Sequence, residues 1–81
     1  MPSYDESLAR VIDTLAPFAK QRGPITEDSD LVGELGLSSI DVMEVIEHVE
    51  DAFDVSFPLN NLPNIRTAGD LAREISRIGD S

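Results

Sequence analysis

Two adjacent serines, Ser38 and Ser39, stand where an amphipathic helix is predicted to begin. The plainest role for such a serine is an N-cap, in which the side-chain hydroxyl accepts a backbone N–H. A phosphate ester would also be favoured there, because free backbone N–H groups and the positive end of the helix dipole would face it. The pair therefore indicates either a helix cap or a site for a phosphodiester, and position alone does not choose between the serines.

Serine-based hydrolysis would need a histidine base within hydrogen-bond reach of one of these hydroxyls. The only histidine is His48, and about 13.5 Å of helical rise separates it from Ser39 on the same predicted helix. The segment 36–40 also lacks the second glycine of a nucleophile elbow. We therefore expect His48 to be an ordinary surface residue, and we do not expect the protein to be an enzyme.

A metal site is weakly suggested by Asp28 and Asp30, which stand like the first ligands of an EF-hand calcium loop. The pattern then fails, because Val32 occupies the fifth position and Ser39 the twelfth, where calcium needs a bidentate glutamate. We expect no dedicated metal site.

Acidic residues dominate the composition, with 16 Asp+Glu against 6 Lys+Arg and a formal net charge of -10. This charge argues against binding to nucleic acid or to an anionic membrane, since both depend on basic residues. The chain contains no cysteine, which excludes a disulfide framework, a thiolate zinc site and a thiol nucleophile of its own. Any thiol chemistry must therefore be supplied by another group.

The length of 81 residues allows one small domain, which we place over 1–81, and makes a deep, enclosed active site unlikely. The chain shows neither the basic start and apolar run of a signal peptide nor an apolar stretch of membrane-spanning length. We expect a cytoplasmic monomer without stable membrane insertion.

Apolar residues at helical spacing predict three main helices. The first begins at the capping pair Ser3 and Glu6 and should end near Ala16, because Pro17 removes a helical hydrogen bond. The second should run from about Ser39 to Phe53. Its predicted buried stripe consists of Val42, Val45, Ile46, Val49, Ala52 and Phe53.

The last helix should begin at the capping pair Thr67 and Asp70 and end at Gly79, and residues 59–62 form at most a short helical turn. Residues 24–37 make a long connection that Leu31, Leu35 and Leu37 should fold back onto the core. The predicted fold is all-α: a small four-helix bundle, three main helices plus one short one, with a long loop between the first two.

The negative charge is concentrated in residues 27–54, which contain ten acidic residues and no Lys or Arg. On the second helix, like charges at Glu47, Asp51 and Asp54 should cost about 0.2–0.5 kcal/mol per pair. The face opposite the apolar stripe contains Ile40, Met43, Glu44, Glu47, Asp51 and Asp54. Two apolar residues among unpaired acids favour a surface that binds a basic partner over a merely solvated one.

Three segments resemble the acyl carrier protein family. Residues 34–46 (ELGLSSIDVMEVI) are similar to the family's attachment motif, 50–58 (EDAFDVSFP) to its acidic helix end and the turn after it, and 65–71 (IRTAGDL) to the start of its last helix. The resemblance covers nearly the whole chain and is closest to free-standing carriers. Ser38 replaces the family's usual Asp, and Glu47 stands where an apolar residue is frequent.

The resemblance implies that Ser39 carries a 4'-phosphopantetheine arm, transferred from coenzyme A by a phosphopantetheinyl transferase. The arm's thiol would hold acyl intermediates as thioesters for fatty acid, lipid or polyketide biosynthesis. Partner enzymes that load or use the acyl group would dock through basic patches. Their predicted binding residues are Ile40, Asp41, Met43, Glu44, Glu47, Glu50 and Asp51.

Two alternatives stay open on the sequence. A peptidyl, aminoacyl or D-alanyl carrier would share the fold and the serine but would be loaded by an adenylating enzyme. A helical module that binds a basic partner would use the serine only as a cap and would not be modified.

Overall fold

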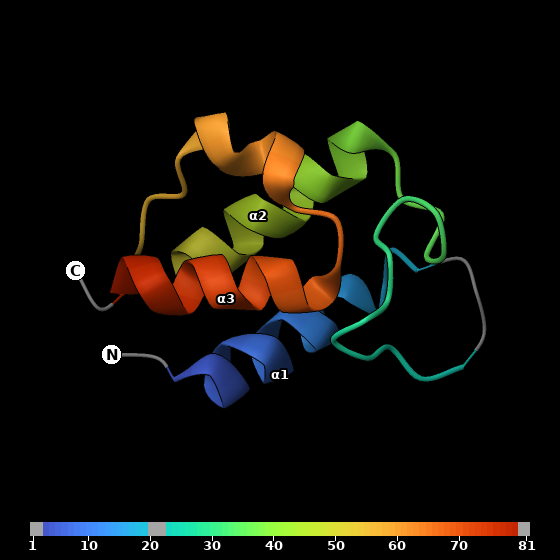
Figure 1. Ribbon diagram of the computed structural model, residues 1–81, viewed down its shortest axis with the longest axis horizontal. Coiled ribbons are helices and arrows are strands. Elements are labelled where there is room, and N and C mark those ends of the chain that lie inside the picture. Colours follow the sequence, from blue (N-terminus) through green and yellow to red (C-terminus); the bar gives the residue numbers. More distant parts are fainter. Residues whose placement is uncertain (1–2, 20–22, 80–81) are drawn as a thin grey trace.

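The computed structural model describes residues 3–19 and 23–79, and within these ranges it has three α-helices and one 3-10 helix (Figure 1). They are α1 (Tyr4–Leu15), α2 (Ser39–Phe53), η1 (Leu59–Asn64) and α3 (Ala68–Gly79). The only β pairing of the described residues is an isolated antiparallel bridge between Asp30 and Thr67. The all-α prediction, with a long loop between the first two helices, is confirmed.

Helix α1 begins and ends where the sequence predicts. The Ser3 hydroxyl accepts the Glu6 backbone N–H at 3.1 Å, which is the serine half of the predicted capping pair. The helix ends at Leu15, and Ala16 closes it by donating its N–H to the Ile12 carbonyl. Pro17 has no N–H to continue the helix.

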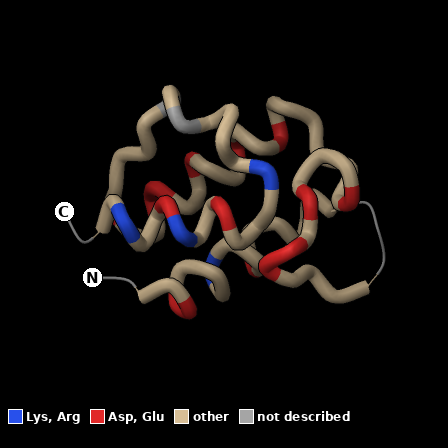
Figure 2. The backbone as a smooth tube through the Cα atoms, viewed as in Figure 1, with Lys and Arg blue, Asp and Glu red and all other residues tan. Residues whose placement is uncertain are grey.

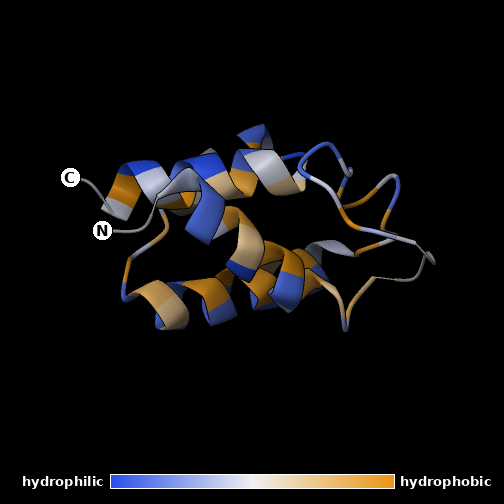
Figure 3. Cartoon of the chain, turned by 90° about the horizontal axis from the view of Figure 1, so that it is seen from below, coloured by the Kyte–Doolittle hydropathy of each residue, from blue (hydrophilic) through white to orange (hydrophobic). Residues whose placement is uncertain are grey.

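The core forms where the apolar stripes of the helices meet, and α1 packs against both α3 and α2. In Figure 3 the hydrophobic colouring gathers on the sides of the helices that face one another. Ala52 was predicted to lie in the buried stripe of α2 but is exposed. Its position at the edge of the stripe leaves it beside Phe18 and His48 at a surface hollow. The buried apolar residues are Val11, Leu15, Leu31, Leu35, Leu37, Val42, Val45, Ile46, Val49, Phe57, Ala68, Leu71, Ala72 and Ile75.

The long loop is folded onto the core, as its three leucines predicted. Backbone hydrogen bonds also tie it to the start of α3: Leu31 N–H donates to the Arg66 carbonyl at 2.9 Å, and Gly69 N–H donates to the Glu27 carbonyl at 2.8 Å. A Cβ on Gly69 would lie only 2.8 Å from that carbonyl oxygen, so glycine is required for this close approach.

In the described chain, acidic residues lie on all three α-helices and along the long loop, whereas the basic residues lie on α1, α3 and the segment before α3 and not on α2 or on the loop from residue 23 (Figure 2). No described helix combines the length and the hydrophobicity needed to cross a membrane.

Candidate functional site

The two serines at the start of α2 have different roles in the structure. Ser38 is the N-cap: its hydroxyl accepts the Asp41 N–H at 3.1 Å, and the Asp41 carboxylate accepts the Ser38 N–H at 3.1 Å. This reciprocal pair is a capping box. The Ser38-x-x-Asp41 spacing is visible in the sequence, although it did not enter the prediction.

Ser39 is the first residue of α2, and its side chain is exposed. The opening N–H groups of a helix have no partner within the helix, and the helix dipole adds positive potential at this end. A negatively charged ester on Ser39 is therefore favoured electrostatically, while the cap on Ser38 keeps the helix start intact.

Ser39 lies at the edge of a groove of about 190 Å³. Three separate parts of the chain form it: the loop before α2, the first turn of α2, and the segment from η1 to α3. Its apolar lining consists of Leu31, Val32, Val42, Leu62 and Ile65, and its polar lining of Ser39, Asp30 and Arg66. The groove therefore offers mostly apolar surface directly beside Ser39.

Asp30 braces the loop beside this groove. Its Oδ1 accepts the N–H groups of Val32 at 3.1 Å and Gly33 at 2.8 Å, and its Oδ2 lies 3.8 Å from Arg66 Nε. The Asp30 carboxylate therefore accepts backbone N–H groups of the turn that follows it, as aspartate commonly does in loops. Among the residues described, no three His, Cys or acidic side chains gather into a metal-binding group.

The exposed face of α2 is arranged as predicted, with Ile40 68% and Met43 44% exposed among acidic neighbours. Glu44, Glu47 and Asp51 are exposed on the helix, and Asp54 is exposed at its left-handed C-cap. Two apolar residues are therefore exposed among acidic side chains for which the described part of the chain shows no ion pair.

Two of the acidic residues predicted to bind partners also make bonds within the chain. Asp41 closes the capping box, and Glu50 Oε2 accepts the Phe57 N–H at 2.6 Å. Both side chains are half-buried. A second groove of about 260 Å³ lies here, lined by Met43, Ile46, Glu47, Glu50 and Phe57. The Glu50 bond holds the segment after α2 against this helix.

His48 is exposed, as predicted, and its ring lies 6.4 Å from that of Phe18, centroid to centroid. His48 lines a hollow together with Arg10 and Ala52, whereas Ser39 lines the groove at the start of α2. The two side chains do not come together as a nucleophile and base.

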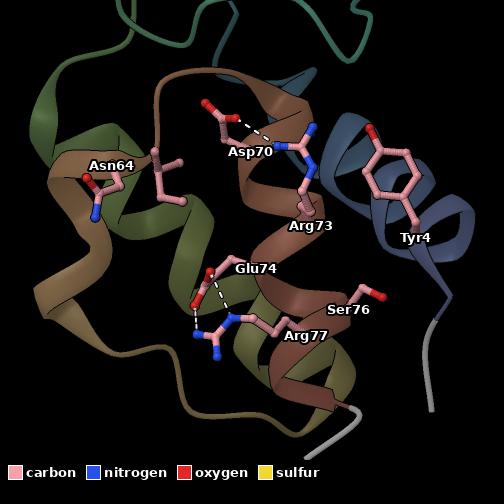
Figure 4. Close-up of a pocket in the computed structure, with 8 residues that line it drawn as sticks. Tyr4, Asn64, Asp70, Arg73, Glu74, Ser76 and Arg77 are labelled. Carbon is pink, nitrogen blue, oxygen red and sulfur yellow. Dashed lines mark hydrogen bonds and ion pairs between the residues drawn. The ribbon is translucent and has the colours of Figure 1, made fainter.

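A hollow of about 640 Å³ lies between Tyr4, the end of η1 and α3 (Figure 4). Its arginines are committed to neighbouring carboxylates: Arg73 pairs with Asp70 at 3.1 Å, and Arg77 pairs with Glu74. Figure 4 shows both guanidinium groups turned toward these acids. The hollow is therefore a surface with internally balanced charge.

Three residues at this hollow have shifted pKa values, and the hydrogen bond to Glu74 raises the pKa of Arg77. Burial, together with the negative charge of Glu27, raises the pKa of Tyr4. For Asp70, burial acts to raise the pKa, but hydrogen bonds from the N–H groups of Arg66 and Thr67, and from Arg73, outweigh it and leave the pKa below its usual value. The predicted capping pair at the start of α3 is thus present and charged.

The groove residues Val32, Leu62, Ile65 and Arg66 were not among the predicted site residues. Each is distant in sequence from Ser39 or, like Val32, lies in a loop whose path depends on tertiary contacts. No local pattern indicates that they would meet.

Comparison with known proteins gives a consistent result. The family model described as "Phosphopantetheine attachment site" matches residues 9–75. The chain is 36% identical over 52 residues to a probable acyl carrier protein of Caulobacter vibrioides, a match that covers 64% of this chain and 60% of that protein. It is 33% identical over 63 residues to an acyl carrier protein of Syntrophobacter fumaroxidans, covering 76% of this chain and 78% of the relative. The chain thus spans less than two thirds of the Caulobacter protein.

Proposed function

The chain belongs to the phosphopantetheine-attachment family, whose members are carriers and not catalysts, and from this membership we propose that it is an acyl carrier whose arm is attached to Ser39. Family membership establishes a phosphopantetheine-bearing carrier. We further propose which serine is modified, what class of cargo is carried and which residues bind the partner enzymes.

One observation carries the choice of serine: both side chains are exposed, but Ser38 is engaged in the capping box, whereas Ser39 lines the groove. Modification of Ser38 would turn the oxygen that accepts the Asp41 N–H into an ester oxygen, which is a weaker acceptor, and would bring the phosphate's negative charge beside the Asp41 carboxylate. Modification of Ser39 leaves both capping bonds in place and brings the phosphodiester to the positive end of α2.

The residues present fit the arm. Ser39 supplies the ester oxygen, the first turn of α2 faces the phosphate, and the apolar groove accommodates carbon chain. When bound, the group supplies the thiol on which an acyl chain is carried as a thioester. No cysteine of the chain competes with that thiol, because the sequence contains none.

The groove lining favours an aliphatic acyl group over an amino acid as cargo. Leu31, Val32, Val42, Leu62 and Ile65 offer apolar surface. The ammonium group of an aminoacyl thioester would lose hydration there, and the carboxylate in the lining, Asp30, already accepts two backbone N–H groups. This supports a fatty acid, lipid or polyketide role over the peptidyl, aminoacyl or D-alanyl alternative.

The α2 face defines the proposed docking surface for the phosphopantetheinyl transferase and for acyl-loading and acyl-using enzymes. Ile40 and Met43 provide apolar contact, and Glu44, Glu47 and Asp51 provide charge for basic patches, while Asp41 and Glu50 combine this role with their bonds inside the chain. Such a surface favours fast, salt-sensitive association.

The test is intact mass after incubation with coenzyme A and a broad-specificity phosphopantetheinyl transferase. We expect the wild type and Ser38→Ala to gain one phosphopantetheine and Ser39→Ala to gain none. Loss of the gain only in Ser38→Ala would move the site to Ser38. No gain in any chain would leave a non-carrier interaction module as the better explanation of the acidic face.

If the modification is found, loading assays separate the cargoes. An acyl-acyl carrier protein synthetase should load the modified chain with fatty acid, and adenylating enzymes for amino acids or D-alanine should not. Efficient loading with an amino acid would overturn the acyl assignment.

A further inference from the structure

Of the described residues that line the groove with Ser39, one is a cation. Arg66 lines the same groove as Ser39 and is carried by the segment just before α3. Its side chain is 81% exposed and its Nε lies 3.8 Å from Asp30 Oδ2, at the outer limit of an ion pair. Exposed pairs of this length contribute little, so the guanidinium is free to exchange partners.

Asp30 does not depend on Arg66. Its Oδ1 already accepts the N–H groups of Val32 and Gly33, and these bonds hold the loop turn whether or not the guanidinium is near. Departure of Arg66 would therefore leave the wall of the groove in place.

The backbone of Arg66, in contrast, is fixed. Its carbonyl accepts the Leu31 N–H at 2.9 Å, and its N–H donates to Asp70 Oδ2 at 3.1 Å. An exposed side chain on an anchored backbone is suited to reach a charge that is introduced into the groove.

The other described arginines are not available for that charge. Arg73 and Arg77 pair with Asp70 and Glu74 on α3 (Figure 4), and Arg10 lines a different hollow with Phe18 and His48. Residues 27–54 contain no Lys or Arg, so a phosphodiester on Ser39 would enter an acidic segment without a basic neighbour from that segment.

We propose that Arg66 is the counter-ion of the phosphodiester on Ser39: its guanidinium leaves Asp30 once the arm is attached and holds the phosphate at the groove, so that the arm lies along the apolar lining. This inference rests on the proposed function. Arg66 acts here as a positioning residue. A guanidinium can bind phosphate oxygens through two parallel N–H groups, which fixes direction as well as charge.

The test compares apo and modified chains by NMR, using the wild type, Arg66→Gln, Arg66→Lys and the matched control Arg10→Gln, which makes the same charge change at the distant hollow. Intact mass first confirms that each chain carries the arm, and circular dichroism of each apo chain confirms its helices. In the wild type, modification should shift the Arg66 Nε–Hε signal and leave that of Arg10 in place.

The phosphorus signal reports the arm itself. It should be broader in the wild type and in Arg10→Gln than in Arg66→Gln, because loss of the guanidinium frees the phosphate to move, and Arg66→Lys should fall between them. Added salt should narrow the wild-type signal toward that of Arg66→Gln and leave the latter unchanged, since salt screens the pair.

Equal phosphorus signals in the wild type and Arg66→Gln, with an unmoved Arg66 Nε–Hε signal, would overturn the inference while the mass gain preserved the carrier assignment. If Arg66→Gln does not fold, the Arg66 Nε–Hε signal in apo and modified wild type decides the question by itself. Absence of any mass gain would refute the proposed function and this inference together.

Discussion

Ser38 and Asp41 each bind the other's backbone N–H through their side chains, at 3.1 Å in both directions, and so close the start of the helix on which Ser39 stands. The two neighbouring serines therefore have different roles at the start of α2. Ser38 satisfies the backbone, and Ser39 keeps its hydroxyl at the surface beside the groove.

This division predicts opposite phenotypes for the two serines. Ser38→Ala should lower the free energy of unfolding by about 1 kcal/mol, the usual cost of losing a cap, and should retain modification. Ser38→Asp should restore most of that stability, because aspartate is also a good N-cap. Urea unfolding measures both, and equal stability of all three chains would contradict the cap.

Asp70 predicts a pH-dependent contribution to stability. Its folded pKa lies below the ordinary value, so its contribution is fully present above the unfolded pKa of about 3.9 and is lost as the pH falls through the folded pKa. Asp70→Asn should cost about 1–2 kcal/mol at pH 7, and the gap to wild type should narrow in acid.

The control for Asp70 is Asp13→Asn, which makes the same charge change at an exposed position of α1. Urea midpoints at neutral pH and below pH 3 give the comparison. A gap between wild type and Asp70→Asn that stayed constant over this range would show that the charge of Asp70 is not what stabilises the start of α3.

Gly69 predicts that one methyl group would disrupt the docking of the loop. In Gly69→Ala the added Cβ would meet the Glu27 backbone oxygen at 2.8 Å, and relief of such a clash typically costs about 1–3 kcal/mol. Gly33→Ala is the graded control, because its Cβ would meet side-chain atoms of Asp30 no closer than 3.2 Å. Denaturant unfolding should rank Gly69→Ala as the less stable chain.

The groove predicts that spectra depend on the length of the acyl chain. Going from a butanoyl to an octanoyl thioester should move the amide signals of Val32, Val42 and Ile65, which line the groove, and leave Ala52, which borders another hollow, in place. Identical spectra for apo and acylated chains would show that the acyl chain stays outside the protein.

The α2 face predicts charge-dependent recognition by the transferase. Glu44→Lys should lower kcat/KM for loading by roughly three- to tenfold at low salt, with the difference shrinking as salt is added. Asp13→Lys, with the same charge change on α1, should load like wild type. Equal losses of kcat/KM in both chains would show that loading depends on net charge alone, and would contradict a docking role for this face.

Local patterns were sufficient for the helices. The stripe of Val42, Val45 and Ile46 predicted the buried side of α2, and Pro17 predicted the end of α1, because helical periodicity and the missing N–H of proline act over a few residues. The leucines of the long loop also lie in the core as predicted.

Contacts between distant segments could not be predicted in the same way. Arg66 approaches Ser39 only because the loop docks onto the start of α3 through the bond from Leu31, and the Glu50 bond to Phe57 depends on the path of the chain after α2. Ala52 lies at the margin of its stripe, where periodicity alone does not distinguish buried from exposed.

The hydrogen bond from Leu31 to Arg66 joins two walls of the groove through backbone atoms alone. This link does not depend on the lining side chains that lie outside the buried core, Val32, Leu62 and Ile65. Substitutions at Val32, Leu62 or Ile65 can widen or narrow the space beside Ser39 while this link stays in place, so cargo size can be retuned, by evolution or by a protein engineer, without rebuilding the scaffold.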